Sequence, residues 1–264
     1  MRNLRYFAAV TLVVSGVSLI PAVALGLFQG GPGEGAAWPA NSAGVASIPV
    51  CFRAIGTAGQ DAQNNPYKVG YLRDATTGSY SDKYSATEWA EKRALVRDAI
   101  ESAWQRWSNI VFTGWGDCPS NIASGIYVDL IRSPGNDFGG DSMPRGYHAQ
   151  GVKVWLRMDT ADQRLLRSVI MHEFGHALGF HHEMDRPDAK YSNGAQICTD
   201  GPVEYSSGTY LTAYYDDVSI MNYCGPPNRN GLSAGDIEGV QKLHGTSAAG
   251  QWLKALPSLS LYAL

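Results

Sequence analysis

The sequence predicts an α/β (α+β) fold, in which helices pack against a twisted, mostly parallel sheet. Three observations support this prediction. Several short apolar stretches have the length and alternation of strands, a long amphipathic helix follows the first of them, and a second helix follows the last. The predicted strands are residues 48–53, 110–113, 125–131 and 152–157.

The first helix is predicted to follow Thr87. Ser85 and Glu88 have the spacing of a capping box, in which each side chain accepts the backbone N–H of the other residue. We expect the stripe of this helix to lie on the sheet, with its tryptophans in the core. The residues of the stripe, which recur every three or four positions, are Trp89, Arg93, Val96, Ile100, Ala103 and Trp107.

The second helix is predicted to begin near Ala161, with Asp159 or Thr160 as its N-terminal cap. Between the two helices, residues 133–146 are rich in Gly, Pro, Asp and Asn. These residue types favour turns, so this segment is predicted to be a loop.

The N-terminal residues predict export. Arg2 and Arg5 precede an apolar stretch from residue 6 to about residue 27, and residues 22–24 (Ala-Val-Ala) offer a small-x-small cleavage site. We therefore expect residues 1–24 to be a signal peptide, and the protein to be secreted without stable membrane association. The alternative is a membrane anchor formed by residues 6–27, because this stretch approaches the length that spans a bilayer.

The rest of the chain divides into three parts. Residues 25–47 are rich in Gly, Ala and Pro and show little apolar periodicity, so they are predicted to be a linker or a short pro-segment. Residues 48–246 contain the predicted strands and helices and form one domain. Residues 247–264 are a tail whose apolar side chains are expected to pack against that domain.

The composition fits a globular domain without a polyanionic partner. Hydrophobic residues make up 44% of the 264 positions and charged residues 17%, which argues against disorder. The formal net charge of −3 gives no basic surface, so no nucleic-acid partner is predicted.

The four cysteines form an even set, and export would place them in an oxidising compartment. Four cysteines allow 3 pairings. We favour Cys51–Cys118 and Cys198–Cys224, which keep each disulfide within one half of the chain. Free buried thiols are the alternative.

Residues 172–183 (HEFGHALGFHHE) contain the metalloprotease pattern HExxHxxGxxH. His172 and His176 lie about 40° apart around a helix axis and about 6 Å apart along it, so both rings reach one metal ion. Glu173 is placed to reach a metal-bound water rather than the metal. The alternative is two core histidines and a third that matches by chance.

The third ligand depends on Gly179. In an unbroken helix His182 would lie about 15 Å along the axis from His172, too far to share its ion. A glycine can adopt the left-handed conformation that ends a helix, which lets His182 return to the metal. His181 does not match the spacing, so we expect it at the surface or behind the ligands.

The ligand set predicts the chemistry. Three neutral nitrogen ligands and a fourth position for water are typical of a catalytic zinc site rather than a structural one. Zinc lowers the pKa of bound water to about 7, and Glu173 is the predicted base that passes the proton to the leaving amine. The sequence therefore predicts a metalloendopeptidase with one Zn²⁺. Asp and Asn in residues 133–146 would also permit calcium, without further support.

The motif resembles that of the metzincin peptidases. Residues 183–188 (EMDRPD) resemble the HExxRxD continuation of astacins, and residues 219–223 (SIMNY) resemble the astacin Met-turn, S-[IV]-M-x-Y, although Asn222 replaces the usual His. The resemblance implies that Met221 forms a hydrophobic floor beneath the metal. It also implies that Tyr223 ligates zinc or stabilises the oxyanion; an ordinary core aromatic is the alternative. HEFGHALG and residues 232–240 are also similar to matrixins.

A metzincin-like zincin catalytic domain, residues 48–246, would place an active-site helix above a cleft and an irregular lower subdomain after Gly179. Its partners would be protein or peptide substrates, bound extended beside a sheet-edge strand that we place near residues 147–157. We expect a monomer. The other functions considered are a catalytically idle zinc-binding recognition module, disfavoured by Glu173, and a non-peptide amidase.

Overall fold

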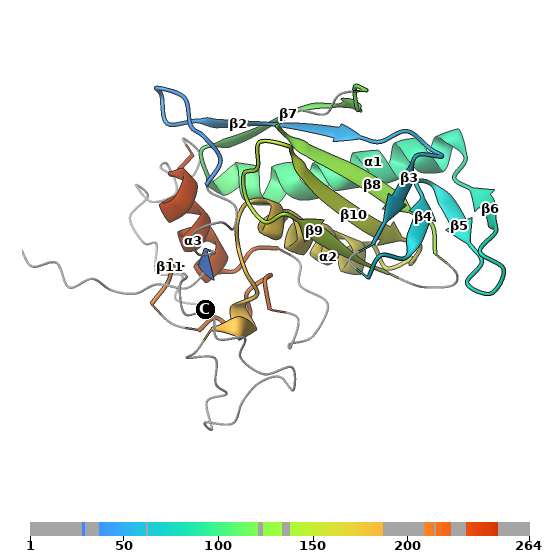
Figure 1. The fold of residues 1–264 in the computed structure, drawn as a ribbon. Helices are drawn as coiled ribbons and strands as arrows, with labels where there is room; N and C mark the ends of the chain where they lie inside the picture. The colour runs from blue at the N-terminus through green and yellow to red at the C-terminus, as the bar shows by residue number, and fades with distance from the viewer. Residues whose placement is uncertain are drawn as a thin grey trace, which may run out of the picture.

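The computed structural model describes residues 28–29, 37–61, 63–120, 124–133, 138–186, 209–213, 215–222 and 231–247. Its framework is a five-stranded sheet with the strand order β7-β2-β8-β10-β9 (Figure 1). β7, β2, β8 and β10 run parallel, and β9 is antiparallel to β10, so the predicted mostly parallel sheet is confirmed. The strands are β2 (Ala46–Phe52), β7 (Ile110–Asp117), β8 (Ile126–Ile131), β9 (Phe138–Met143) and β10 (Val152–Met158).

Three two-stranded sheets were not predicted, because strands of two to four mostly polar residues give no alternating apolar pattern. Two of them are hairpins at the end of the domain opposite α3 (Figure 1). Tyr67 and Val69 bring apolar side chains from the β3–β4 region onto Ile131 and Trp155 of the central sheet. The strands are β1 (Phe28–Gln29) with β11 (Thr209–Tyr210), β3 (Ala58–Gln60) with β4 (Pro66–Lys68), and β5 (Tyr71–Arg73) with β6 (Tyr80–Lys83).

α1 (Ala86–Ile100) begins with the predicted capping box. The Ser85 hydroxyl accepts the Glu88 N–H at 3.2 Å, and the Glu88 carboxylate accepts the Ser85 N–H at 2.8 Å. A π-helical turn, Glu101–Gln105, then shifts the apolar stripe, so that Trp104 is fully buried whereas Trp107 is half-buried. A constant helical period cannot reveal such a shift.

α2 (Gln163–Ala177) begins later than predicted. Asp162 caps it by accepting the N–H groups of Arg164 and Leu165, at 3.0 and 3.2 Å. Asp159 has other partners, since its carboxylate accepts the Tyr84 hydroxyl at 3.1 Å. The remaining helices are a 3₁₀ turn (Glu183–Asp185) and α3 (Ala234–His244).

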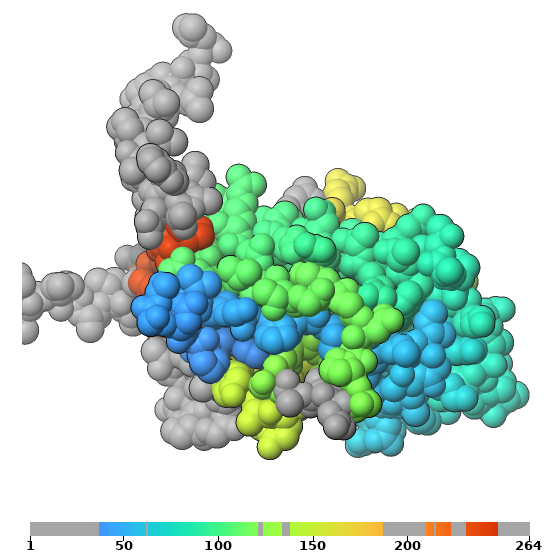
Figure 2. Space-filling model, turned by 90° about the horizontal axis from the view of Figure 1, so that it is seen from above, coloured from blue at the N-terminus to red at the C-terminus, as the bar shows by residue number. Residues whose placement is uncertain are grey.

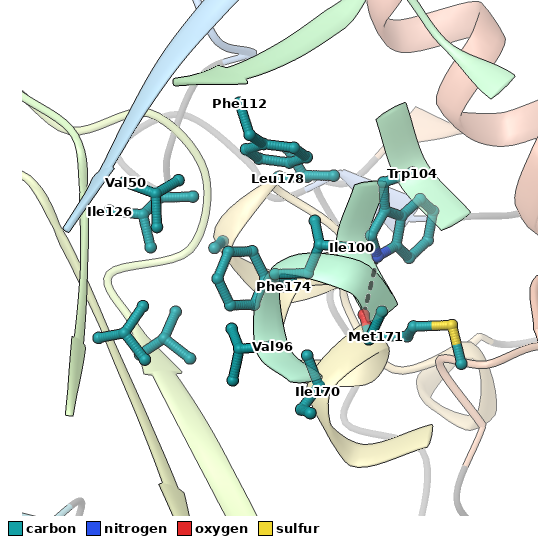
Figure 3. Packing of buried hydrophobic residues seen from close by; sticks show 14 of the residues in the cluster. Val50, Val96, Ile100, Trp104, Phe112, Ile126, Ile170, Met171, Phe174 and Leu178 are labelled. Atoms are coloured by element: carbon teal, nitrogen blue, oxygen red, sulfur yellow. Dashed lines mark hydrogen bonds between the residues drawn. The ribbon is translucent and has the colours of Figure 1, made fainter. Parts of the chain in front are cut away.

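α1 and α2 pack on the same face of the sheet and form the core with it (Figure 3). The Trp104 indole N–H crosses from the π-helical turn to donate to the Met171 carbonyl at 2.9 Å, which ties the first helix to the second. α2, which carries two of the three predicted metal ligands, is therefore anchored by this bond and by its buried side chains. The labelled core residues include Val50, Val96, Ile100, Phe112, Ile126, Ile170, Phe174 and Leu178.

Two predictions about the sheet edge are wrong. Residues 133–146, predicted to be a loop, contain β9, because backbone hydrogen bonds to β10 form despite the low strand propensity of glycine. The edge strand, predicted near residues 147–157, is instead β9. β10, which contains most of those residues, lies inside the sheet between β8 and β9.

The predicted linker, residues 25–47, is corrected at its C-terminal end. Trp38 is only 5% exposed, donates its indole N–H to the Ala177 carbonyl at 2.8 Å, and packs edge-on against Tyr147. β2 starts at Ala46, and its blue surface is continuous with that of the neighbouring green β7 (Figure 2). The domain thus includes residues before the predicted boundary at 48.

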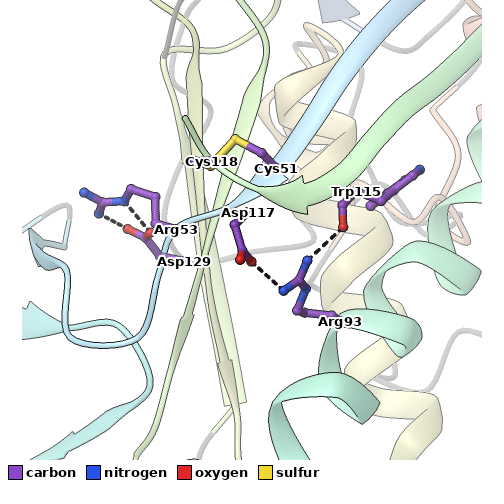
Figure 4. The surroundings of a disulfide bond; sticks show 7 residues. All are labelled: Cys51, Arg53, Arg93, Trp115, Asp117, Cys118 and Asp129. Carbon is purple, nitrogen blue, oxygen red and sulfur yellow. Dashed lines mark hydrogen bonds and ion pairs between the residues drawn. A yellow bond between two sulfur atoms is a disulfide. The ribbon is translucent and has the colours of Figure 1, made fainter. Parts of the chain in front are cut away.

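One predicted disulfide, Cys51–Cys118, is present and joins β2 to the end of β7 (Figure 4). Beside it, the Arg93 guanidinium of α1 binds the Asp117 carboxylate at 2.7 Å and the Trp115 carbonyl at 2.9 Å. This edge of the sheet is therefore fixed by a covalent bond and an ion pair.

Several predictions fall outside the described residues: the signal peptide (1–24), the disulfide Cys198–Cys224, and nearly all of the tail (247–264). Within the ranges that are described, no helix combines the length and the apolar character needed to cross a membrane.

We predict that replacing Trp38 lowers stability. Trp38→Ala should reduce the free energy of unfolding by about 3–5 kcal/mol through the lost packing. Trp38→Phe should cost less, because it removes mainly the hydrogen bond to Ala177, worth about 1 kcal/mol. Urea unfolding measures both, with the exposed Pro39→Ala as the control. Unchanged stability of Trp38→Ala would support the linker interpretation instead.

Candidate metal centre

α2 places three of the predicted site residues, His172, Glu173 and His176, on one helix. Its opposite face is held in the core by Leu166, Ile170 and other apolar side chains. This packing fixes the rotation of the helix, and therefore the direction in which the histidines point.

At the end of α2, Gly179 has the left-handed conformation that its predicted role requires. Its φ is +106°, a conformation that residues with a Cβ rarely adopt. The Gly179 N–H donates to the His176 carbonyl at 2.9 Å, and the Phe180 N–H donates to the Gly175 carbonyl at 3.0 Å. These two bonds form a Schellman motif, which ends the helix and turns the chain back.

The turn brings His182 beside the two helical histidines. The Nε2 atoms of His176 and His182 are 3.0 Å apart, and one ligand atom from each of His172, His176 and His182 lies within 4.8 Å of the others. Nitrogen ligands about 2.0–2.1 Å from a tetrahedral zinc are about 3.3 Å apart, so this spacing fits the metal.

Two of these histidines, His172 and His176, form hydrogen bonds through Nδ1 that orient their rings for metal binding. The Nδ1 atoms of His172 and His176 bind the carbonyls of Ile220 and Phe180, at 2.8 and 2.6 Å. Such bonds fix the tautomer and leave Nε2 for the metal. Burial, followed by the neighbouring His172 and His182, lowers the pKa of His176 well below its usual value, which keeps it neutral as a ligand must be.

Glu173 lies under β9. A Cβ added to Gly140 would stand 2.6 Å from Glu173 Cγ and 2.8 Å from the Trp155 carbonyl oxygen, so only a glycine leaves room for this side chain. Burial, followed by the charge of Asp141, raises the pKa of Glu173 well above its usual value, and Arg145 partly opposes this shift. A raised pKa suits a carboxylate that must accept and release a proton near neutral pH.

Met221 lies beneath α2, as the astacin resemblance implies. Its side chain is fully buried, and its sulfur contacts the helix at Gly175, where an added Cβ would collide with it. The Met221 carbonyl accepts the Glu183 N–H at 3.0 Å. Asn222, at the position where astacins carry His, is buried and donates to the Tyr215 hydroxyl, which stabilises the same turn.

His181 is not at the surface, so that alternative is wrong. It is fully buried, and its Nδ1 lies 2.6 Å from an Arg145 guanidinium nitrogen. Burial, followed by the charge of Arg145, lowers the pKa of His181 to about 4, so the ring is neutral and accepts from the arginine. Tyr223, the second predicted catalytic residue, lies outside the described residues.

Three residues of this site were not predicted from the sequence: Gly140, Arg145 and Glu183. Gly140 and Arg145 lie in the segment interpreted as a loop, and glycine in such a segment gives no functional signal. Glu183 is the first residue of the astacin-like stretch 183–188, and that resemblance gave it no role. Its side chain is 1% exposed, accepts the Asp216 N–H at 2.9 Å, and lies 3.4 Å from Arg186.

Comparison with known proteins gives structural similarities only. No protein-family model matches the chain, and no curated protein sequence matches it. The chain is similar to high choriolytic enzyme 1, a hatching-enzyme zinc protease from Oryzias latipes (medaka fish), with 19% identity over 80% of this chain and 95% of that one, and a TM-score of 0.48.

The chain is also similar to two structures of myroilysin. Each is 17% identical, over 79% and 84% of this chain and 95% and 94% of theirs, with TM-scores of 0.42 and 0.41.

Gly179→Val is predicted to lose zinc as well as stability. A β-branched residue at this φ should cost about 1–3 kcal/mol and displace His182 from the other two ligands. Gly44→Val is the matched control, because Gly44 also has a positive φ, +76°, and no atom within 4 Å of an added Cβ. Zinc content by mass spectrometry decides: stoichiometric zinc in Gly179→Val would contradict the geometry.

Gly140→Ala is predicted to displace Glu173 without loss of the metal ligands. A shift of about 1 Å in a catalytic group costs about 10²-fold in rate, so kcat should fall by that order while zinc content stays unchanged. Gly116→Ala on β7 is the control, since no atom lies within 4 Å of its added Cβ. Equal peptidase rates in the two variants would argue against this contact.

Proposed function

We propose that this chain is a secreted, zinc-dependent metalloendopeptidase, astacin-like rather than matrixin-like, that acts as a monomer on proteins or peptides. One observation carries the proposal: the imidazoles of His172, His176 and His182 converge, and Glu173, the residue that follows His172 on the same helix, is buried. A purely structural zinc site would have no use for that carboxylate.

The three histidines would hold one Zn²⁺, which supplies a bound water of lowered pKa and polarises the scissile carbonyl. Glu173 accepts the proton of the attacking water and delivers it to the leaving amine. Its burial under Gly140 supports this role, because the carboxylate is held away from bulk water and its pKa is raised.

The substrate would bind as an extended peptide beside β9. This strand pairs with β10 on one side, and its other edge has no strand partner in the described part of the sheet. A peptide that adds to this edge gains backbone hydrogen bonds and passes close to Glu173, which lies under Gly140. Phe138 and Met143 on β9 are 38% and 54% exposed, so they offer apolar contacts to substrate side chains.

Tyr223 is proposed to stabilise the oxyanion. It follows Met221 by two positions, and Met221 lies directly beneath α2. A tyrosine hydroxyl is a suitable donor to developing negative charge. The disulfide Cys51–Cys118 supports secretion, because such bonds persist in oxidising compartments.

The proposal predicts chelator-sensitive proteolysis that depends on Glu173. The chain should cleave casein, 1,10-phenanthroline should abolish cleavage, and added zinc should restore it. Glu173→Gln should keep one zinc per chain and lose about 10²–10⁴-fold in kcat, because the base is gone while the ligands remain.

Glu238→Gln is the control for Glu173→Gln, because Glu238 lies on the surface of α3 in an ion pair with Lys242 at 2.9 Å. Its activity should equal that of the unaltered chain. Bound zinc without cleavage of any of several protein substrates would favour a recognition module, and full activity of Glu173→Gln would exclude its role as the base.

A further inference from the structure

The hydrogen bond that orients His172 comes from a distant part of the chain. His172 Nδ1 binds the Ile220 carbonyl at 2.8 Å, 48 positions away in sequence. His176 instead binds the Phe180 carbonyl, four positions away, in the turn that ends its own helix. The orientation of His172 therefore depends on what holds Ile220.

Asp236, in the first turn of α3, holds Ile220 and its neighbour. One carboxylate oxygen of Asp236 accepts the Ser219 hydroxyl at 2.6 Å, and the other accepts the Ile220 N–H at 2.8 Å. The Ser219 oxygen in turn accepts the Met221 N–H at 3.0 Å. Asp236 thus holds Ser219 and Ile220 directly, and it holds Met221 through the Ser219 hydroxyl.

The Asp236 carboxylate is buried, and hydrogen bonds fix its position. The residue has no exposed surface, and its second oxygen also accepts the Ser233 N–H at 2.8 Å. A buried carboxylate is tolerated only when its oxygens are satisfied, and the positive end of a helix dipole favours it further. Removing one acceptor would leave buried donors without a partner.

We propose that Asp236 is a positioning residue for the metal ligand His172. It fixes the Ile220 backbone, and the Ile220 carbonyl fixes the tautomer and rotation of the imidazole, so that Nε2 points at the metal. The inference rests on the proposed function in one respect, that His172, His176 and His182 bind zinc. Asp236 itself belongs to α3 and lies 59 positions after Ala177, the last residue of α2.

A purely structural role would be to cap α3 through the Ser233 N–H. In that case a substitution would lower stability but leave the metal site of the folded protein unchanged. The positioning role differs, because it changes the affinity and the ligand field of a metal bound to folded protein.

The test is zinc affinity of the full chain with Asp236→Asn, measured by competition with a chelator under native conditions. The amide keeps the shape but replaces an acceptor with a donor that faces other donors. We expect zinc affinity to fall about 10–100-fold, as for other partners of metal ligands. The visible absorption of the cobalt(II)-substituted protein should shift as well.

Glu238→Gln, on the exposed side of the same helix, is the control and should leave zinc affinity and the cobalt spectrum unchanged. Wild-type affinity and an unshifted spectrum in folded Asp236→Asn would overturn the inference. If Asp236→Asn does not fold, Ser219→Ala decides, since it removes one bond to the carboxylate. A loss of about fivefold in zinc affinity supports the inference, and no loss overturns it.

The unaltered chain is assayed in parallel for zinc content and casein cleavage. A chain that binds no zinc would contradict the proposed function itself. A chain that binds zinc and cleaves casein, while both variants bind zinc as tightly as it does, would contradict only the role of Asp236.

Discussion

A helix that ends inside a protein leaves its last carbonyl groups without helical partners, and each must find another donor. α2 ends in this way, in the middle of the domain. Gly179 and Phe180 donate to carbonyls within the helix, whereas Trp38 donates to the Ala177 carbonyl from the N-terminal segment. The Gly146 N–H donates to the His176 carbonyl at 3.0 Å, from the connection between β9 and β10. The arrangement of the site follows from this helix end.

The same turn explains why one short sequence brings three histidines together. Gly179 reverses the chain, so His182 meets His176, and the carbonyl of Phe180 becomes available to orient His176. On the other face of the site, β9 approaches Glu173 so closely that position 140 must be glycine. The site is thus formed between a helix end and a strand edge, and both are anchored by backbone hydrogen bonds.

The lower part of the site depends on buried carboxylates. Glu183 holds the segment before Met221 through the Asp216 N–H, and its own N–H donates to the Met221 carbonyl. Asp236 holds the same segment from α3. Burial raises the pKa of Glu183 to about 8 and that of Asp236 to about 6, and both shifts are opposed by hydrogen bonds that favour the charged form. In this lower part of the site, hydrogen bonds from buried carboxylates hold the backbone in place. In the hydrophobic core, apolar side-chain packing has that role.

The sequence alone determined the parts of this protein that depend on local spacing. The histidine pattern, the left-handed glycine and the capping box at Ser85 all involve residues within a few positions of one another, and each is found where it was predicted. Short strand-like apolar runs likewise predicted β2, β7, β8 and β10.

Tertiary structure decided the rest, because the remaining features arise from contacts between distant segments. β9 forms through pairing with β10, Trp38 joins the core through the end of α2, and Gly140 matters only because Glu173 lies beneath it. Neither apolar periodicity nor motif spacing indicates contacts between residues so far apart in the sequence. The three histidines could be identified from one helix and its turn. The groups that hold and orient them come from strands, a second helix and an N-terminal segment, which meet only in the folded chain.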